Sequence, residues 1–116
     1  MSGSKKVIKV NLPKPTVLEV SGGKLHVPDL HGRPATAEVR YETIKVGDSI
    51  LLVMDRLLEI YEITHVVSAS DASSGKAKIA IDNEFLADDL GVRDANLYYY
   101  VNHDARSEGL AFTLTY

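Results

Sequence analysis

Apolar and polar residues alternate clearly in the stretch from Ala35 to Asp55. From Ala37 to Tyr41 every second residue is apolar, which is the pattern of a half-buried strand. From Ile50 to Met54 every residue is apolar, which is typical of a strand in the middle of a sheet or covered on both faces. Val46-Gly47-Asp48 supplies turn residues between the two predicted strands.

Further strands follow from the same kind of pattern. The apolar residues of 57–67 fit a helical period almost as well, but their β-branched content favours a strand. Ser68–Gly75 has the composition of a loop, so we expect the strands on either side of it to pair as a long hairpin. The two strands of this hairpin are Glu59–Val67 and Lys76–Asp82. The other predicted strands are Thr16–Val20, Asn96–Asn102 and Ser107–Tyr116.

One short helix is predicted at Glu84–Leu90, capped by Asp82 or Asn83 and closed by Gly91. About seven short strands and one helical crossover predict an all-β fold, an immunoglobulin-like antiparallel β-sandwich. Leu25 and Val27 are expected to reach its core. The alternating positions predict that the core contains Val39, Tyr41, Ile50, Leu52, Ile79, Ile81, Tyr99, Val101, Phe112 and Leu114.

The length of 116 residues predicts one domain. We expect the sandwich to span residues 13–116, after an N-terminal extension, residues 1–12, in which Val7–Val10 could form an edge strand. No apolar run is long enough for a membrane helix, and no signal-peptide pattern is present. The sequence therefore predicts no membrane insertion.

Charge and composition narrow the classes of partner. The chain has 13 basic and 16 acidic residues and a net charge of −3, which argues against nucleic-acid binding. The one basic cluster, Lys5, Lys6 and Lys9, is explained by a solubilising leader at least as well as by phosphate contacts. The absence of cysteine excludes disulfides and thiolate metal sites.

No catalytic motif is present, and no cofactor is expected. The compact set of Ser107, His103 and Asp104 would suit a small hydrolase only if the fold aligned a nucleophile, a base and an orienting group. His26 and His31 flank a loop and are expected to be solvated rather than to share a metal. An acidic group could hold calcium, but it lacks the EF-hand spacing and is read as a solvated face: Asp82, Glu84, Asp88, Asp89 and Asp94.

Three consecutive tyrosines are the strongest candidate for a binding surface. Tyr99 should face the core, whereas Tyr98 and Tyr100 should lie on the other face of the same strand. Exposed tyrosines could form a platform for a carbohydrate or a protein. They could equally lie under a covering loop, and both interpretations stay open.

The order of several segments resembles a known family. LPKPTVLEV is followed by L-x-V at Leu25, AEVRY-x(5)-GDSILLVM, L-x-Y-x-V at Leu97 and an alternating final strand. This order resembles the immunoglobulin-like repeats of roughly 100 residues that occur in tandem in large surface or secreted proteins of Pseudomonas and related proteobacteria. Such repeats carry a tryptophan where this chain has Met54, and a glycine-rich loop where it has Asp55–Leu58.

The resemblance implies a non-catalytic structural or adhesive module, extracellular or at the cell surface as part of a larger protein, with neighbouring repeat modules as partners. Leu12–Pro15 would then be a stiff joint. The alternative is a stand-alone β-sandwich that binds carbohydrate or protein through Tyr98 and Tyr100. The final strand, Leu110–Tyr116, carries no proline or lysine, so if it lies at a sheet edge we expect weak self-association through it.

Overall fold

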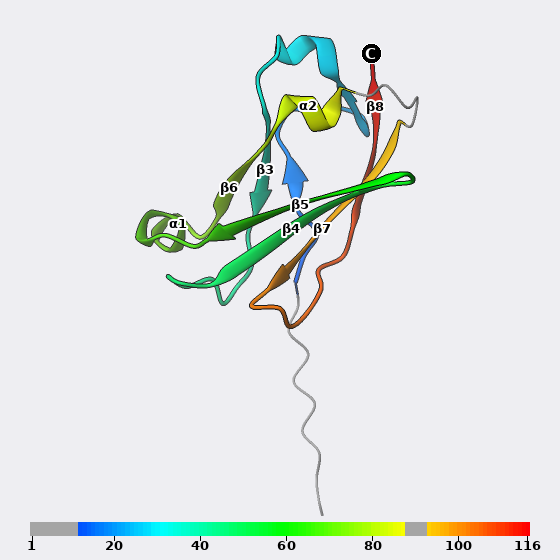
Figure 1. Ribbon diagram of the computed structural model, residues 1–116. Coiled ribbons are helices and arrows are strands. Elements are labelled where there is room, and N and C mark those ends of the chain that lie inside the picture. The colour runs from blue at the N-terminus through cyan, green and yellow to red at the C-terminus, as the bar shows by residue number, and fades with distance from the viewer. Residues whose placement is uncertain (1–11, 88–92) are drawn as a thin grey trace, which may run out of the picture.

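The chain folds into two β-sheets that pack face to face (Figure 1). The computed structural model describes residues 12–87 and 93–116. Within these residues the fold is all-β, with few helical turns, and no helix has the length and apolar content to cross a membrane. The strands are β1 (Thr16–Val17), β2 (Lys24–His26), β3 (Ala35–Val39), β4 (Ser49–Arg56), β5 (Glu59–Val66), β6 (Ala77–Ile81), β7 (Asp94–Val101) and β8 (Leu110–Thr115).

The smaller sheet has the strand order β1-β3-β6, and all its pairings are antiparallel. The alternation predicted for β3 and β6 is confirmed by their burial. The predicted hairpin between β5 and β6 is wrong, because β6 pairs with β3, with Ala37 opposite Ile79. The segment after β5 carries the chain from one sheet to the other, so consecutive strands face each other across the core instead of lying side by side.

The larger sheet has the strand order β2-β8-β7-β4-β5. The apolar strand β4 pairs with β5 on one side and β7 on the other, as its pattern predicts. The ambiguous segment that follows is the strand β5, not a helix. One pairing departs from the antiparallel prediction, because β2 runs parallel to β8, with Leu25 opposite Leu114.

A continuous apolar core fills the space between the sheets. The predicted core residues are buried, except that Val101 is only half-buried. Leu25 and Val27 are also buried, as expected. Tyr99 is fully covered at the centre, with its ring centroid 6.2 Å from that of Tyr41. The prediction of an inward-facing Tyr99 is therefore confirmed.

The helices are short. A 3₁₀ helix, η1 (Val27–Leu30), follows β2, and α2 (Asn83–Leu86) stands where one short helix was predicted. Asp82 is its N-cap residue, without a side-chain cap hydrogen bond. The helix ends at Leu86, because Ala87 is extended, whereas it was predicted to continue to Leu90. Asp88–Leu90 and the predicted closing residue, Gly91, lie outside the described residues, as do Val7–Val10.

The segment predicted as a loop, Ser68–Gly75, contains a helix, α1 (Ala69–Ser74). Ser68 and Asp71 form a capping box, in which the Ser68 side chain accepts from the Asp71 backbone and the Asp71 side chain accepts from the Ser68 backbone. Gly75 closes the helix in the left-handed conformation with a φ of 79°. These caps satisfy backbone groups that a short helix otherwise leaves unpaired, and they outweigh the loop-like composition.

The last strand is not at a sheet edge. β8 lies between β7 and β2, which covers Thr113–Thr115. The expectation that an unpaired Leu110–Tyr116 would drive self-association is therefore corrected, because β2 pairs alongside Thr113–Thr115. The larger sheet instead ends at β2 and β5.

We expect Leu52→Ala to lower the free energy of unfolding by roughly 2–5 kcal/mol, because removing a buried side chain leaves a cavity. Leu52 is 1% exposed in the middle of β4. Leu57→Ala is the matched control, because Leu57 is 86% exposed just beyond the end of the same strand. Urea unfolding of both variants checks the prediction, and similar losses for the two would contradict the burial of Leu52.

Candidate functional site

Tyr98 and Tyr100 lie on the outer face of β7, as their spacing predicts. Their rings meet edge to face with centroids 6.0 Å apart. The Arg106 guanidinium lies 3.7 Å from the centre of the Tyr98 ring, a cation–π contact, and Tyr98 is buried while Tyr100 is half-buried. The arrangement therefore resembles the covered alternative more than an open platform. A ligand-binding role for these tyrosines stays a prediction.

A groove on the outer face of the larger sheet lies next to these tyrosines. It has a volume of about 1060 Å³. Ala111 of β8 lines it opposite Asn96 of β7, and just before β8 a Cβ at Gly109 would overlap the Asn96 side-chain amide. The groove is lined by Gly23, Asp55, Leu57, Arg93, Asp94, Ala95, Asn96, Ala111, Phe112 and Thr113.

The groove combines carboxylate, amide and hydroxyl groups with one apolar wall. Thr113 donates a hydrogen bond from its hydroxyl to Asp94 over 3.3 Å, and Leu57 contributes the apolar side. Within residues 12–87 and 93–116, no three His, Cys, Asp or Glu side chains are placed to hold a metal ion. The Arg93 guanidinium also lines the groove, so the lining has both hydrogen-bond donors and acceptors. Sequence reasoning missed the groove, because its floor depends on the pairing of β7 with β8.

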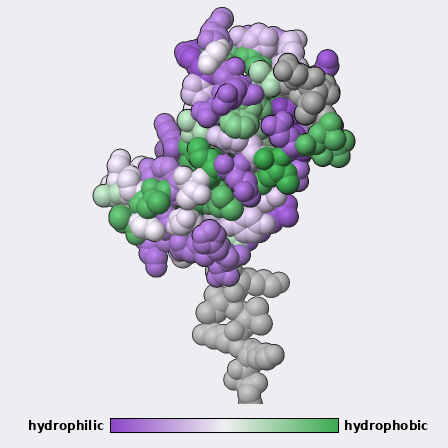
Figure 2. Space-filling model, viewed as in Figure 1, coloured by the Kyte–Doolittle hydropathy of each residue, from purple (hydrophilic) through white to green (hydrophobic). Residues whose placement is uncertain are grey.

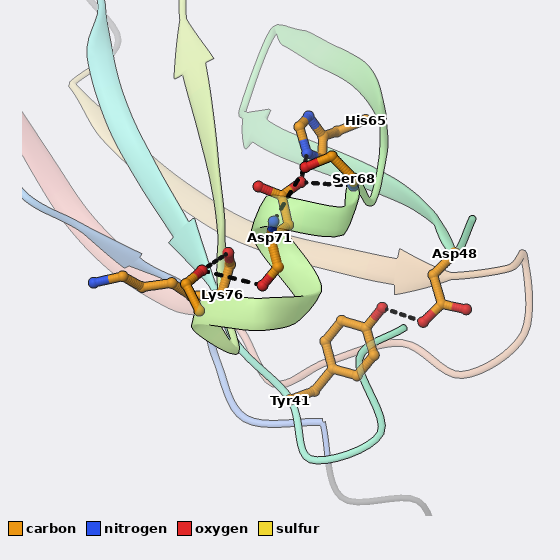
Figure 3. Close-up of polar contacts among 7 residues, drawn as sticks. Tyr41, Asp48, His65, Ser68, Asp71 and Lys76 are labelled. Carbon is orange, nitrogen blue, oxygen red and sulfur yellow. Dashed lines mark hydrogen bonds and ion pairs between the residues drawn. The ribbon is translucent and has the colours of Figure 1, made fainter. Parts of the chain in front are cut away.

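A buried carboxylate sits at the crossing between the sheets (Figure 3). Asp48 is 3% exposed. Its Oδ2 accepts hydrogen bonds from the Tyr41 hydroxyl at 2.6 Å and from the Lys45 backbone N–H at 3.2 Å. Its Oδ1 accepts from the Asn102 side-chain amide at 3.1 Å. The connection between β3 and β4 and the distant turn after β7 therefore meet at one side chain, which the sequence presents only as part of a turn.

The environment of this cluster shifts the pKa of the Asp48 carboxyl group and that of the Tyr41 hydroxyl. Burial alone would raise the pKa of Asp48, but hydrogen bonds from Tyr41, Asn102 and the Lys45 backbone lower it below its usual range. Burial, followed by the hydrogen bond and charge of Asp48, raises the pKa of Tyr41 well above its usual value. Asp48 is therefore a structural carboxylate held in its charged form, and not a poised proton donor.

A second polar cluster joins β5 to α1 (Figure 3). His65 Nε2 lies 2.8 Å from Asp71 Oδ2, which also accepts from the Ser68 backbone N–H at 3.0 Å. The Ser68 hydroxyl oxygen accepts from the Asp71 N–H at 3.1 Å. The hydrogen bond from the Ser68 backbone, and then that from His65, lower the pKa of Asp71. The serine is thus used for helix capping and does not face the histidine as a nucleophile would.

The Ser107, His103 and Asp104 set is not assembled as a catalytic site. Ser107 is buried, its hydroxyl donates to the Glu108 carbonyl at 2.9 Å, and it accepts from the Tyr99 N–H at 2.9 Å. His103 and Asp104 are exposed in a type I′ turn, because Asn102 and His103 both have positive φ and the Asp104 N–H donates to the Val101 carbonyl at 3.0 Å. The turn therefore has a structural explanation.

The other histidines are separate from one another. The His26 ring lies 2.8 Å from the Thr115 hydroxyl, linking β2 to β8, whereas His31 ends η1 in the left-handed conformation. Asp82, Glu84 and Asp94 form no metal-binding group among the described residues. Asp88 and Asp89, the other members of the predicted acidic group, lie outside them.

Comparisons of the chain with protein-family models, curated proteins and solved structures found no match. The resemblance to immunoglobulin-like repeats therefore stays a prediction.

We expect Asp48→Asn to lower the free energy of unfolding at pH 7 by about 1–3 kcal/mol, because the amide cannot accept from all three donors. A carboxylate whose pKa is lower in the folded than in the unfolded chain stabilises the fold at pH values above its unfolded pKa, which is about 3.9. This stabilisation is lost as the pH falls through the pKa of the folded state. The free energy of unfolding of the variant should therefore fall less than that of the parent between about pH 5 and pH 2. Urea unfolding at a series of pH values measures this difference.

Asp104→Asn is the control, because Asp104 is an exposed carboxylate in the turn next to Asn102. Equal acid sensitivity of the parent and Asp48→Asn would contradict the stabilising role of the buried carboxylate.

Proposed function

We propose that this chain is a non-catalytic, immunoglobulin-like structural or adhesive module of a larger bacterial surface or secreted protein. In this role it would carry tension along a row of similar modules. The observation that carries the proposal is the parallel pairing of β2 with the last strand, β8, in a domain whose described chain enters at one pole and leaves at the other (Figure 1).

The two poles are defined by local contacts. At one pole the Leu12 carbonyl accepts from the Glu108 N–H at 3.3 Å, beside the turn between β7 and β8. At the other pole the Tyr116 hydroxyl donates to the Leu86 carbonyl of α2 at 2.6 Å. Modules joined through such ends would form an extended row, and force applied to the row would act along the length of each domain.

The β2–β8 pairing suits this direction of force. β2 is connected to the first pole through Gly23 and, before it, through β1, which pairs with β3, and β8 runs to the second pole. Pulling the poles apart would slide one strand along the other, so that their hydrogen bonds, including the 2.9 Å bond from Thr113 N–H to the Gly23 carbonyl, would be loaded together. Bonds loaded together resist more force than bonds that open one at a time.

The leading segment is held as part of the domain. Leu12 is buried, and the Tyr99 hydroxyl at the centre of the core donates to the Pro13 carbonyl at 2.8 Å. Burial raises the pKa of Tyr99 to about 12, so this hydroxyl keeps its proton at physiological pH. Pro13 and Pro15 restrict the backbone dihedral angles on either side of Lys14. These features support a stiff joint at the position where the resemblance implies one.

We expect the domain to resist force in a direction-dependent way. The chain has no cysteine, so single cysteines can serve as unique handles for optical tweezers. Handles at Lys14→Cys and a cysteine added after Tyr116 would load the β2–β8 bonds together. We expect a rupture force several-fold higher than in the control described next.

The control has handles at Asp29→Cys and after Tyr116. Asp29 is exposed in η1, directly after β2, so this pair would peel β2 from β8 one hydrogen bond at a time. Equal rupture forces in the two directions would contradict the proposed load-bearing function.

The groove favours carbohydrate binding as a second candidate function. Its carboxylate, amide and hydroxyl groups can bind sugar hydroxyls, and Leu57 provides an apolar contact. In NMR titrations with oligosaccharides, we expect shifts of the Asp94, Asn96 and Ala111 amides that Asn96→Ala abolishes. Shifts centred on Tyr98 and Tyr100 would place the ligand on the tyrosines instead, and no shifts with any sugar would contradict this function.

A further inference from the structure

Three of the four sheet edges are protected against pairing with another chain. β1 is two residues long and follows Pro15, β2 is three residues long and carries Lys24, and β6 carries the exposed Lys78. Short strands, prolines and lysines are the usual protection of an edge. β5 has eight residues without proline or lysine, and in the described part of the chain its only strand partner is β4.

Exposed apolar side chains gather along this same edge. Seven large apolar side chains are exposed in the described residues, and four of them belong to the β4–β5 hairpin: Leu57 at 86%, Leu58 at 66%, Ile60 at 61% and Val66 at 62%. Figure 2 shows apolar surface at the tip of this hairpin and again toward its other end. Apolar surface concentrated on one element marks an interaction surface more often than scattered single residues do.

The backbone of β5 has alternate residues free to pair. Val67 N–H donates to the Asp48 carbonyl at 2.9 Å, so residues of β5 with odd numbers direct their backbone groups toward β4. The even-numbered residues therefore direct theirs away from the sheet: Ile60, Glu62, Thr64 and Val66. These are also the residues whose side chains lie on the exposed outer face.

We propose that a second copy of this chain pairs antiparallel with the free edge of β5, about a two-fold axis at Ile63. On the outer face this register places Ile60 opposite Val66 and Glu62 opposite Thr64 of the second copy. Apolar residues meet apolar residues, and the carboxylate meets a hydroxyl. The larger sheets of the two copies become one continuous sheet. This inference does not depend on the proposed function.

The inner face agrees with this register. Ile63 is half-buried and meets Ile63 of the second copy, and Tyr61 comes opposite His65. The hydrogen bond from the His65 ring to Asp71 holds α1 on the inner side of β5, away from the free backbone groups of the edge.

Neighbouring registers are less favourable. An axis at Glu62 would place the two Glu62 carboxylates directly opposite each other, and like charges in that position destabilise a pair of strands. An axis at Tyr61 would place Ile60 opposite Glu62. An axis at Thr64 would place Glu62 opposite Val66 and shorten the overlap. The charges and apolar residues of β5 therefore select one self-complementary register.

The selected register also places the tip of the hairpin next to the second copy. Leu58 of the second copy comes opposite Ser68, where α1 begins. Leu58, which is 66% exposed, would then lie near the start of α1 of the other copy. Three of the four exposed apolar residues of the hairpin, Leu58, Ile60 and Val66, are thus placed at one interface, whereas Leu57 lines the groove of its own chain.

Disulfide trapping tests the register directly, because the chain has no cysteine. Residues at the two-fold axis form a non-hydrogen-bonded pair with Cα atoms about 4.5 Å apart, within the range for a disulfide. Ile63→Cys should therefore give a covalent dimer rapidly under mild oxidation. Glu62→Cys should react slowly, although Glu62 is exposed and Ile63 is half-buried. Faster cross-linking of Glu62→Cys would overturn the register.

Charge substitutions test the same contacts without a covalent bond. Ile60→Glu and Val66→Lys should each shift sedimentation toward monomer. An equimolar mixture of the two should restore dimer, because the introduced carboxylate of one chain then faces the introduced ammonium group of the other. A mixture that stays monomeric while each variant is folded, as judged by thermal unfolding, would overturn the register.

Leu18→Lys and Thr115→Lys are the controls for these substitutions. Leu18 is exposed directly after β1, and Thr115 is paired with β2 on the opposite edge of the larger sheet, so both changes should leave dimerisation unchanged. A parent chain that sediments as monomer at millimolar concentration would overturn the proposal.

Discussion

The Asp48 carboxylate is the contact on which the arrangement of the two sheets depends. β3 and β4 follow each other in the chain but belong to different sheets, so the segment between them must leave one layer and enter the other. Tyr41 begins this crossing just after β3, and Asn102 reaches it from the turn between β7 and β8. A charged acceptor bound by several donors fixes the crossing and the turn in one geometry, because losing any donor would leave part of a buried charge unsatisfied.

Tyr99 also holds separate segments together, at the centre of the core. Its ring packs 6.2 Å from that of Tyr41, and its hydroxyl reaches the Pro13 carbonyl at the pole where the described chain begins. Ser107 fixes the same strand from the other side, because its backbone N–H donates to the Tyr99 carbonyl and its hydroxyl accepts from the Tyr99 N–H. The leading segment, the crossing and the final turn are therefore connected through two tyrosines.

Periodicity was sufficient to predict which side chains enter the core, because the two faces of a strand are determined locally. It could not predict strand partners. The alternation of β6 suits either sheet, and the chain reaches β3 only because α1 carries it across the layers. That helix was predictable in principle from Ser68 and Asp71, a capping pattern hidden within a loop-like composition. The helix forms because its capping residues satisfy backbone hydrogen bonds, and the residue composition of the segment does not reveal these bonds.

The candidate surfaces were less predictable, because each depends on residues brought together by pairing. Arg106 covers Tyr98 only because the chain turns back at Asn102 and places it over β7. Ala111 and Asn96 line the groove side by side only because β8 pairs with β7. A sequence pattern assigns a residue to a face of its own strand, whereas exposure on that face is decided by the neighbouring strand.

The order of the larger sheet separates the two proposed roles in space. The β2–β8 pairing, which would carry tension, lies at one edge, and β5, which would pair with a second copy, lies at the other. Lateral pairing would therefore leave the chain poles and the load-bearing hydrogen bonds unobstructed. A row of modules could then associate side by side with a second row while each remained extended. The same edge that would be a liability in an isolated domain would, in such a row, join one row to another.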